Sequence, residues 1–452
     1  MLTAVETNLS RWHRWRTRSV NRRIFSATMM VGVLSICVKI AGWAKLLVIA
    51  QRFGTGNDLD AFLIAFLVPS FLAEIAGVPF SAALIPTLVE IRERQGQREA
   101  QRLFSGVAML AGLILCAVAA AAFLFRRDAL GVLASGFSSA KLELTNSLLL
   151  AMLPLVVMMG ISAVWRAALQ AGEKFALAAT APALTPVVTI LLVLLAGRNF
   201  GAHLLAAGAL GGTALELSVI GWAVRRSGYS LIPRWTGMHR ALRQVMGQYA
   251  PMVAGAILLT GAPLVDLAFA AALGAGAVSA LSYGTKLVAV ILAVGPVALS
   301  TVVLPHFSRM AAMRDAEGLR HTLRTYSRLI VLVTFPLALA LAILSEPIVR
   351  MLFQRGAFTA SDSQIVAAVQ RYAAIQIPFA VLSVLILRVI SSVKANRWLM
   401  WGAAVNLIAT LVFDYVFARS MGLPGIALAR TAVSMVSLCY LCSILARALR
   451  RL

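Results

Sequence analysis

The stretch AGWAKLLVIAQRFGTGNDLDAFLIAFLVPSFLAEIAGVPFSAALIPTLVE, residues 41–90, contains two long apolar segments separated by the short polar turn QRFGTGND. The first segment completes an apolar run over residues 26–50, and the second forms a run over 60–88. Each run is long enough to cross a bilayer core of roughly 30 Å as an α-helix. This stretch therefore predicts two successive transmembrane helices.

The same pattern continues along the whole chain. Hydrophobic residues make up 60% of the 452 residues and charged residues only 13%, whereas a soluble domain usually carries about a quarter charged residues. We therefore expect an all-α polytopic membrane protein with about twelve transmembrane helices, in two six-helix halves around a central cavity. The expected spans lie near residues 26–50, 60–88, 104–125, 145–165, 175–197, 202–224, 247–272, 276–305, 329–353, 364–393, 398–418 and 423–446.

Two span ends resemble each other and indicate an internal repeat. The second span ends in AALIPTLVEIRER and the eighth in STVVLPHFSRMAA, so both reach a proline, Pro86 or Pro305, shortly before basic sequence. Paired halves around a cavity are a recurring plan of transporters. We divide the chain into a basic N-terminal segment (1–25), a first half (26–224), a linker (225–246) and a second half (247–452).

The distribution of positive charge predicts the orientation. Of the 41 Lys and Arg residues, 27 fall on the side of the termini, eight fall in the opposite loops and six fall inside spans. Cytoplasmic loops carry the excess of Lys and Arg, so we expect cytoplasmic termini in a bacterial inner membrane. The charge is spread over loops, which argues against nucleic-acid binding. The segment RWHRWRTRSVNRR (11–23) is expected to lie on anionic membrane lipid.

Motifs of enzymes and of bound cofactors are missing from the sequence. It contains no GxxxxGK[ST] phosphate loop, no HExxH and no GxSxG. Cys439 and Cys442 form a CxxC pair inside an apolar run, without a second pair or a nearby histidine. We therefore expect a protein that is not an enzyme and that carries no metal and no cofactor.

Charged residues inside the spans are the candidate functional residues, because a charge at membrane depth is costly and faces the protein interior. As substrate-binding candidates we identify Lys39, Lys45, Asp60 and Lys286. As charge partners within the membrane we identify Glu74, Asp266, Arg371, Arg388 and Arg430. Three lysines facing one cavity would attract an anionic head group such as a pyrophosphate.

Each of these residues also has a structural interpretation. Lys45 can extend toward the membrane surface, and Asp60 can stabilise the start of its own helix. Asp266 can pair with Lys286 across adjacent helices. The three arginines can neutralise Glu216, Asp414 and helix C-termini.

Three segments resemble the MurJ/MviN family of lipid II flippases, within the multidrug/oligosaccharidyl-lipid/polysaccharide exporter superfamily. They are residues 41–90, the segment LSYGTKLVAVILAVGPVALSTVVLPHFSR (281–309), and the turn LFQRGAFTASD (352–362), which is the most specific. The resemblance implies a V-shaped bundle with a central cationic cavity and alternating access. It also implies an undecaprenyl-pyrophosphate-linked glycan as substrate, and a functional link to enzymes of cell-wall or polysaccharide synthesis.

The chain also departs from the family pattern. Lys45 and Lys286 stand where the family usually has arginines, and Asp60 matches the aspartate of a D-A-F motif. Leu46 and Ala289 replace residues that are often acidic in the family. Typical members have two further C-terminal spans.

The sequence thus predicts a flippase for lipid II-like precursors. Two alternatives remain at this point. One is a flippase for exopolysaccharide or O-antigen repeat units. The other is a cation-coupled drug exporter, which would need an acidic cavity.

Overall fold

The computed structural model describes residues 29–196, 200–235, 237–313, 315–392 and 398–449. Every regular element in these ranges is a helix. The first lobe contains a helix at Met29–Phe53 followed by α2 (Asn57–Gln95), α3 (Gln97–Leu124), α4 (Arg126–Leu133), α5 (Ser139–Met152), α6 (Pro154–Ala171), α7 (Phe175–Thr180), the 3₁₀ turn η1 (Ala181–Ala183), α8 (Leu184–Leu195) and α9 (His203–Arg226).

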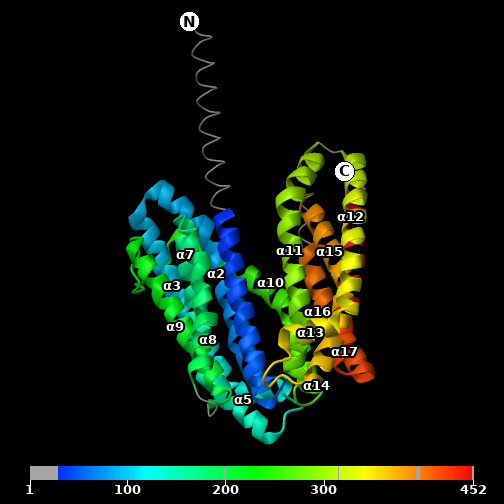
Figure 1. The fold of residues 1–452 in the computed structure, drawn as a ribbon. Helices are drawn as coiled ribbons and strands as arrows, with labels where there is room; N and C mark the ends of the chain where they lie inside the picture. Colours follow the sequence, from blue (N-terminus) through cyan, green and yellow to red (C-terminus); the bar gives the residue numbers. More distant parts are fainter. Residues whose placement is uncertain (1–28, 197–199, 236, 314, 393–397, 450–452) are drawn as a thin grey trace.

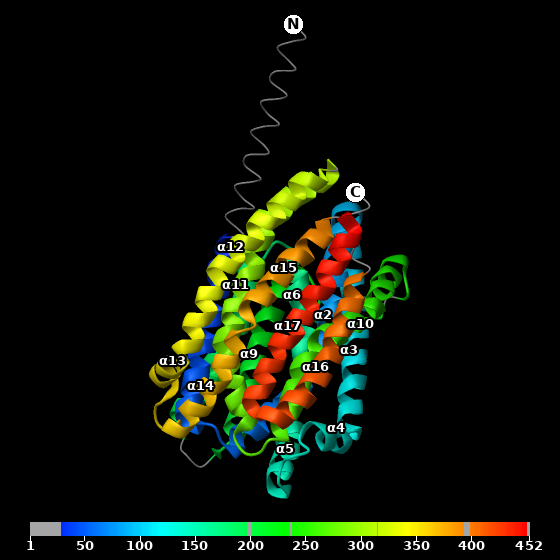
Figure 2. The ribbon, with the colours of Figure 1, turned by 90° about the vertical axis from the view of Figure 1, so that its right-hand side faces the viewer.

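The helix α10 (Arg240–Ala271) lies between the lobes and packs against α2 on one side and α16 on the other. The second lobe consists of α11 (Ala277–Ala312), α12 (Ala316–Ile343), α13 (Ser345–Phe353), α14 (Ala360–Ala374), α15 (Ile377–Ser392), α16 (Leu399–Met421) and α17 (Leu423–Leu449). Figure 1 shows the two lobes as the arms of a V, and Figure 2 shows the second lobe from its outer side.

The predicted all-α membrane fold with about twelve spans is confirmed. Eleven helices of the described ranges are long and apolar enough to cross a membrane, and α11 occupies the remaining expected span at 276–305. The division of the chain into a segment, two halves and a linker stays a prediction. The N-terminal segment 1–25 lies outside the described residues.

Several span boundaries differ from those predicted. The span expected at 145–165 is two helices, because Pro154 lacks the N–H that would continue α5 and instead starts α6. The span expected at 329–353 ends at Ile343, and the short helix α13 follows it. The span expected at 364–393 is divided into α14 and α15. The helix α10 begins inside the expected linker.

Small residues allow the helices of the first lobe to pack closely. A Cβ atom on Gly77 of α2 would lie 2.8 Å from the Cα atom of Gly160 on α6. On the second helix, a Cβ on Gly160 would lie 2.5 Å from the Leu115 side chain of α3. Small residues at helix contacts are characteristic of membrane bundles, and here they let α6 approach both α2 and α3 closely.

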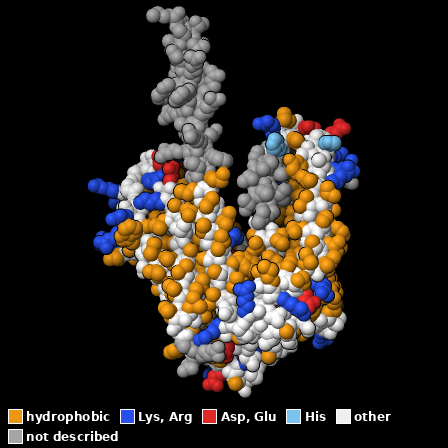
Figure 3. All heavy atoms as spheres, in the orientation of Figure 1, with side chains coloured by type: hydrophobic (Ala, Val, Ile, Leu, Met, Phe, Trp, Pro, Cys, Tyr) orange, Lys and Arg blue, Asp and Glu red, His pale blue; other side chains and the backbone are white. Residues whose placement is uncertain are grey.

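The surface matches a membrane protein. Apolar side chains cover the outer faces of both lobes in Figure 3, while Lys and Arg gather toward the ends. The first described helix starts, and α17 ends, at the same end of the bundle (Figure 1), which we call the terminal end. The turns at 54–56, 272–276 and 354–359 lie at the opposite end, which we call the distal end. The lobes meet at the distal end and are separated by a hollow at the terminal end (Figure 3).

Candidate functional site

A cavity of about 530 Å³ lies between the two lobes. Its walls come from the Met29–Phe53 helix, α2, α8 and α9 of the first lobe, and from α10 and α11. Most of the lining is apolar, including Phe62 and Phe66 of α2 and Ala289 of α11. Such a mainly apolar pocket with a few convergent charges is the usual form of a ligand site.

Three of the four residues predicted to bind substrate line this cavity: Lys39, Lys45 and Lys286. Lys39 and Lys286 are exposed to it and Lys45 is half-buried. Lys45 and Lys286 are close enough to act on each other electrostatically. None of the three forms an ion pair with a described residue. The cavity therefore holds an excess of positive charge, and no described residue supplies a counterion for it.

The two lysines of the first helix share the cavity although they are six residues apart, which is about 240° of helix rotation. The cavity accommodates both because it follows a wide face of that helix, including Gly42, Trp43 and Leu46. Lys45 thus faces the cavity, and the alternative in which it extends to the membrane surface does not apply.

Glu74 lies near the cavity but does not line it. The cavity-lining residues of α2 include Phe66, Leu67 and Ser70, and Glu74 follows Ser70 by four residues, so it continues the same face toward the terminal end. It is exposed and pairs with no described cation. The cavity thus has a cationic centre and an acidic group on the path toward the terminal end.

Aromatic side chains close the cavity toward the distal end. Tyr283 of α11 lines the cavity and is 1% exposed, and its ring packs against Phe353 and Phe358, with centroids 5.3 and 5.6 Å away. Phe353 and Phe358 come from the turn at 352–362 that carries the most specific resemblance. This turn therefore supports the wall of the cavity.

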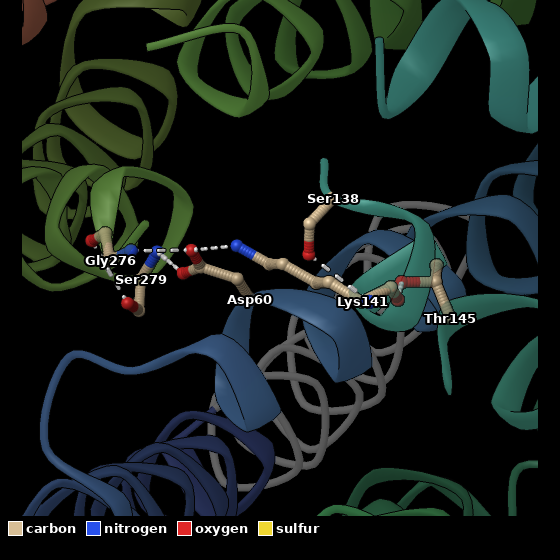
Figure 4. A network of polar contacts seen from close by, with 6 residues as sticks. All are labelled: Asp60, Ser138, Lys141, Thr145, Gly276 and Ser279. Atoms are coloured by element: carbon tan, nitrogen blue, oxygen red, sulfur yellow. Dashed lines mark hydrogen bonds and ion pairs between the residues drawn. The ribbon is translucent and has the colours of Figure 1, made fainter. Parts of the chain in front are cut away.

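Asp60 does not line the cavity, and its predicted role as a substrate ligand is not supported by its position. Its carboxylate is wholly buried and has three donors: Lys141 Nζ at 2.8 Å, the Gly276 N–H at 2.7 Å and the Ser279 N–H at 2.8 Å. Figure 4 shows the carboxylate between Lys141 on one side and the start of α11 on the other.

This network gives the Asp60 carboxylate a structural role, and its role in substrate binding stays a prediction. A carboxylate at a helix N-terminus satisfies free N–H groups and interacts favourably with the helix dipole. Asp60 lies in the first turn of its own helix, but its oxygens accept from the first turn of α11, in the other lobe. It therefore joins the two lobes.

Lys141 was not among the candidate residues predicted from the sequence, because it counts among the eight Lys and Arg of the loops opposite the termini. It is 7% exposed and also lies over the Phe137 ring, with Nζ 3.8 Å from the centroid. The sequence indicated such a residue only indirectly, because a buried aspartate in span 2 requires a nearby cation or several hydrogen-bond donors.

Further contacts join the lobes at the distal end. The Ala357 N–H donates to the Gln51 carbonyl at 2.8 Å, and the Thr55 hydroxyl contacts the Asp362 carboxylate. Gly54 adopts a φ of +58°, and a Cβ there would lie 2.4 Å from the Ala357 carbonyl oxygen. Together with the Asp60 network, these contacts form what we call the distal lock.

The remaining intramembrane charges take different partners from those suggested by sequence. Asp266 pairs with Arg430 of α17 and not with Lys286. Glu216 accepts from Arg166 and Ser162, both at 2.8 Å.

Arg371 is exposed, Arg388 is half-buried, and neither pairs with a described acid. Within the described ranges, no group of three or more His, Cys, Asp or Glu side chains is arranged to hold a metal ion.

Two lobes of membrane-spanning helices around a charged cavity that is closed at one end define a polytopic membrane transporter. The family model of the lipid II flippase MurJ matches residues 49–451. The chain therefore belongs to the MurJ lipid II flippase family.

Two relatives agree with this assignment. The probable lipid II flippase MurJ of Vibrio cholerae is 24% identical over 94% of this chain and 83% of its own length. The lipid II flippase MurJ of Burkholderia cenocepacia is 25% identical, over 90% and 80%.

Among solved structures, a lipid II flippase MurJ in an inward closed conformation has a TM-score of 0.78 at 21% identity, over 93% of this chain and 90% of that one. An inward-facing multidrug resistance MATE transporter has a TM-score of 0.72 at 12% identity, over 94% and 99%. These two likenesses concern the fold.

Proposed function

We propose that this chain translocates lipid II, an undecaprenyl-pyrophosphate-linked sugar precursor, from the inner to the outer leaflet of the bacterial inner membrane. The observation that carries the proposal is the cavity between the lobes, which has Lys39, Lys45 and Lys286 on its walls and no counterion among the residues that the structure describes. The names of the relatives support lipid II as the glycan carrier.

The charge of the cavity fits a pyrophosphate. A pyrophosphate diester carries about two negative charges, and lysine binds phosphate as a compact point charge. At an effective dielectric constant of 20, two unit charges 4 Å apart attract each other by about 4 kcal/mol. Two or three lysines therefore offset much of the cost of taking the head group out of water.

The orientation follows from the charge distribution. With the termini in the cytoplasm, as the excess of Lys and Arg on that side indicates, the hollow between the lobes opens to the cytoplasm and the distal lock lies on the periplasmic side. The head group enters from the inner leaflet and meets the lysines before it reaches the closed end.

Transport then requires the distal lock to open while the terminal end closes. The two lobes are expected to rock about the cavity, so that Asp60, which stays beside Lys141 in the first lobe, separates from the start of α11. The membrane potential favours export of an anion, by roughly 2.3 kcal/mol for each charge that crosses 100 mV. This driving force needs no ATP.

Two further partners belong to the proposal. The basic segment 1–25 is expected to bind anionic lipid at the cytoplasmic face. Enzymes of cell-wall synthesis are expected to act before and after the flippase, since its substrate is both made and consumed.

The two alternatives are less well supported. A drug exporter for cationic compounds needs an acidic cavity, and here the charged residues on the cavity wall are lysines. A flippase for other lipid-linked glycans would use the same lysines, so only a comparison of substrates separates it from a lipid II flippase.

The test is translocation by the purified chain in proteoliposomes. Lipid II and a second undecaprenyl-pyrophosphate glycan are supplied in parallel, with the chain and without it. We expect faster movement of lipid II across the bilayer than in protein-free vesicles. Movement of the second glycan alone would overturn the assignment of lipid II, and movement of neither would overturn the flippase proposal.

A further inference from the structure

Glu74 of α2 differs from the other acidic side chains in the middle of the spans. Glu216, Asp266 and Asp414 are buried in the helix bundle, and the first two pair with arginines. Glu74 is exposed and forms no ion pair with a residue that the structure describes. A charge at membrane depth is costly and marks a functional position by default, so Glu74 is a candidate for contact with a ligand.

The position of Glu74 on its helix directs it into the hollow between the lobes. Leu67 and Ser70 line the central cavity, and their directions differ by about 60° around the helix axis. Glu74 points between these two directions, one turn closer to the terminal end. A neighbouring face of α2 is covered by α10, where Phe80 stacks on Tyr249 with ring centroids 4.0 Å apart. Glu74 therefore continues the cavity wall into the part of the hollow that opens at the terminal end (Figure 3).

Glu74 lies at a different depth from the two lysines that act on each other in the cavity. Lys45 precedes the distal turn at 54–56 by nine residues, and Lys286 follows the distal turn at 272–276 by ten. At 1.5 Å per residue, both lie about 14–15 Å from the distal end. Glu74 follows the turn at 54–56 by eighteen residues, which places it about 27 Å from that end. The acidic group and the cationic centre are thus separated by about 12 Å along the bundle.

A head group held at the lysines extends toward Glu74. Tyr283 and the rings packed on it close the distal side, and a cavity of about 530 Å³ has the size of a site for a drug-sized molecule. The pyrophosphate of lipid II carries a disaccharide and a peptide, which together are larger than such a molecule. The sugar and peptide part therefore lies in the hollow on the terminal side of the lysines, where Glu74 is exposed.

The peptide of lipid II offers a group that fits a carboxylate. Its diamino-acid residue carries a free amine, which is a primary ammonium at neutral pH. An extended chain spans at most about 3.3–3.6 Å per residue, so a sugar and a few peptide residues cover the distance from the lysines to Glu74. An ammonium and a carboxylate form a charge-assisted hydrogen bond, which is stronger than one between neutral groups.

We propose that Glu74 binds a primary ammonium group on the peptide of the head group and thereby selects amine-bearing substrates. The inference rests on the proposed function and adds a second contact with the same substrate. The opposite charges of Glu74 and the lysines also fix the orientation of the head group, because the carboxylate repels a pyrophosphate and the lysines repel an ammonium. The pyrophosphate then lies near the closed end and the peptide on the terminal side.

The test compares two forms of lipid II that differ only in this amine. One form has the free amine and the other has it acetylated, so the pyrophosphate, the sugars and the undecaprenyl chain are unchanged. Dissociation constants are measured for the purified full chain in nanodiscs. Hydrogen bonds to charged groups are strong in buried sites and ion pairs in water are weak, so for this partly hydrated site we expect the parent protein to bind the amine form roughly tenfold more tightly.

Glu74→Gln removes the charge and keeps the size of the side chain. We expect this variant to bind both forms with similar affinity, and to bind the acetylated form as the parent does, which also shows that it is folded. Glu74→Asp keeps the charge and should retain part of the preference. The matched control is Glu90→Gln, because Glu90 is an exposed glutamate of the same helix that pairs with Arg94 at 2.8 Å. That variant should keep the preference of the parent.

Two results overturn the inference: equal binding of the two forms by the parent, or a preference for the amine form that persists in Glu74→Gln. In both cases a parent protein that binds and moves lipid II leaves the proposed function standing. A parent protein that binds neither form and moves no lipid II overturns the proposed function, and the inference with it.

Discussion

Removing Lys141 from the distal lock should destabilise the closed distal end, and the contacts of Lys141 determine the free-energy cost. Lys141 is nearly buried, and its Nζ lies 2.8 Å from the wholly buried Asp60 carboxylate. Removing one partner of a buried ion pair usually costs roughly 3–5 kcal/mol. Asp60 keeps its two backbone donors in Lys141→Met, so we expect about 2 kcal/mol, since a hydrogen bond to a charged group contributes roughly 1.5–3 kcal/mol.

The free-energy cost of Lys141→Met destabilises mainly the state in which the distal end is closed. When the lobes separate there, Asp60 and Lys141 reach water and the substitution matters little. A difference of about 2 kcal/mol changes an equilibrium roughly 30-fold. Lys141→Met should therefore shift the protein toward the distally open state by about that factor.

The population is measurable by the distance between two spin labels on opposite sides of the distal mouth. Asn57 and Arg355 are exposed and lie on different lobes, so cysteines there serve as attachment points once the four native cysteines are replaced. The longer distance should gain population in Lys141→Met. Asp60→Asn combined with Lys141→Met should show a smaller shift than the sum of the single changes, because no unpaired charge remains.

The matched control is Lys174→Met. Lys174 is exposed and its Nζ donates to the Ser227 hydroxyl at 2.9 Å, outside the lock. Its distance distribution should equal that of the parent. If Lys141→Met also gives the parent distribution, Lys141 does not stabilise the closed distal end.

Two predictions concern stability. Gly77→Val places a side chain against the backbone of Gly160 and should cost about 1–3 kcal/mol of stability, seen as a lower apparent melting temperature in detergent. In Gly42→Ala the added Cβ meets no atom within 4 Å, so this variant should melt like the parent. Equal melting temperatures of the two variants would contradict the close approach of α2 and α6. Phe358→Ala removes a buried ring from the cluster with Tyr283 and should cost roughly 3–5 kcal/mol, so an unchanged melting temperature would show that the cluster contributes little.

The sequence predicted the spans because hydropathy is local: each apolar run shows its own length. It did not predict the break before Pro154 or the one between α14 and α15, because the apolar sequence continues across both. Boundaries of this kind depend on backbone hydrogen bonds, which hydropathy does not record.

The site was predicted in part for a related reason. Lys39, Lys45 and Lys286 could be selected because a charge in an apolar run is conspicuous, whatever its partner. The partners themselves could not be predicted. Lys141 and Asp60 are 81 residues apart, Asp266 and Arg430 are 164 apart, and only the packing of distant helices decides which charges meet. Lys141 sits between apolar runs and so looked like a loop residue.

The cavity lysines are proposed to hold the pyrophosphate, so the affinity for lipid II should depend on their charge. The dissociation constant is measured for the purified chain in nanodiscs, for Lys45→Gln combined with Lys286→Gln, and for Lys174→Gln as the exposed control. Each lost charged contact is worth roughly 1.5–3 kcal/mol, so the double variant should bind about 100-fold more weakly or worse, while the control binds like the parent. A double variant that is folded and binds lipid II as tightly as the parent would show that these lysines do not hold the pyrophosphate.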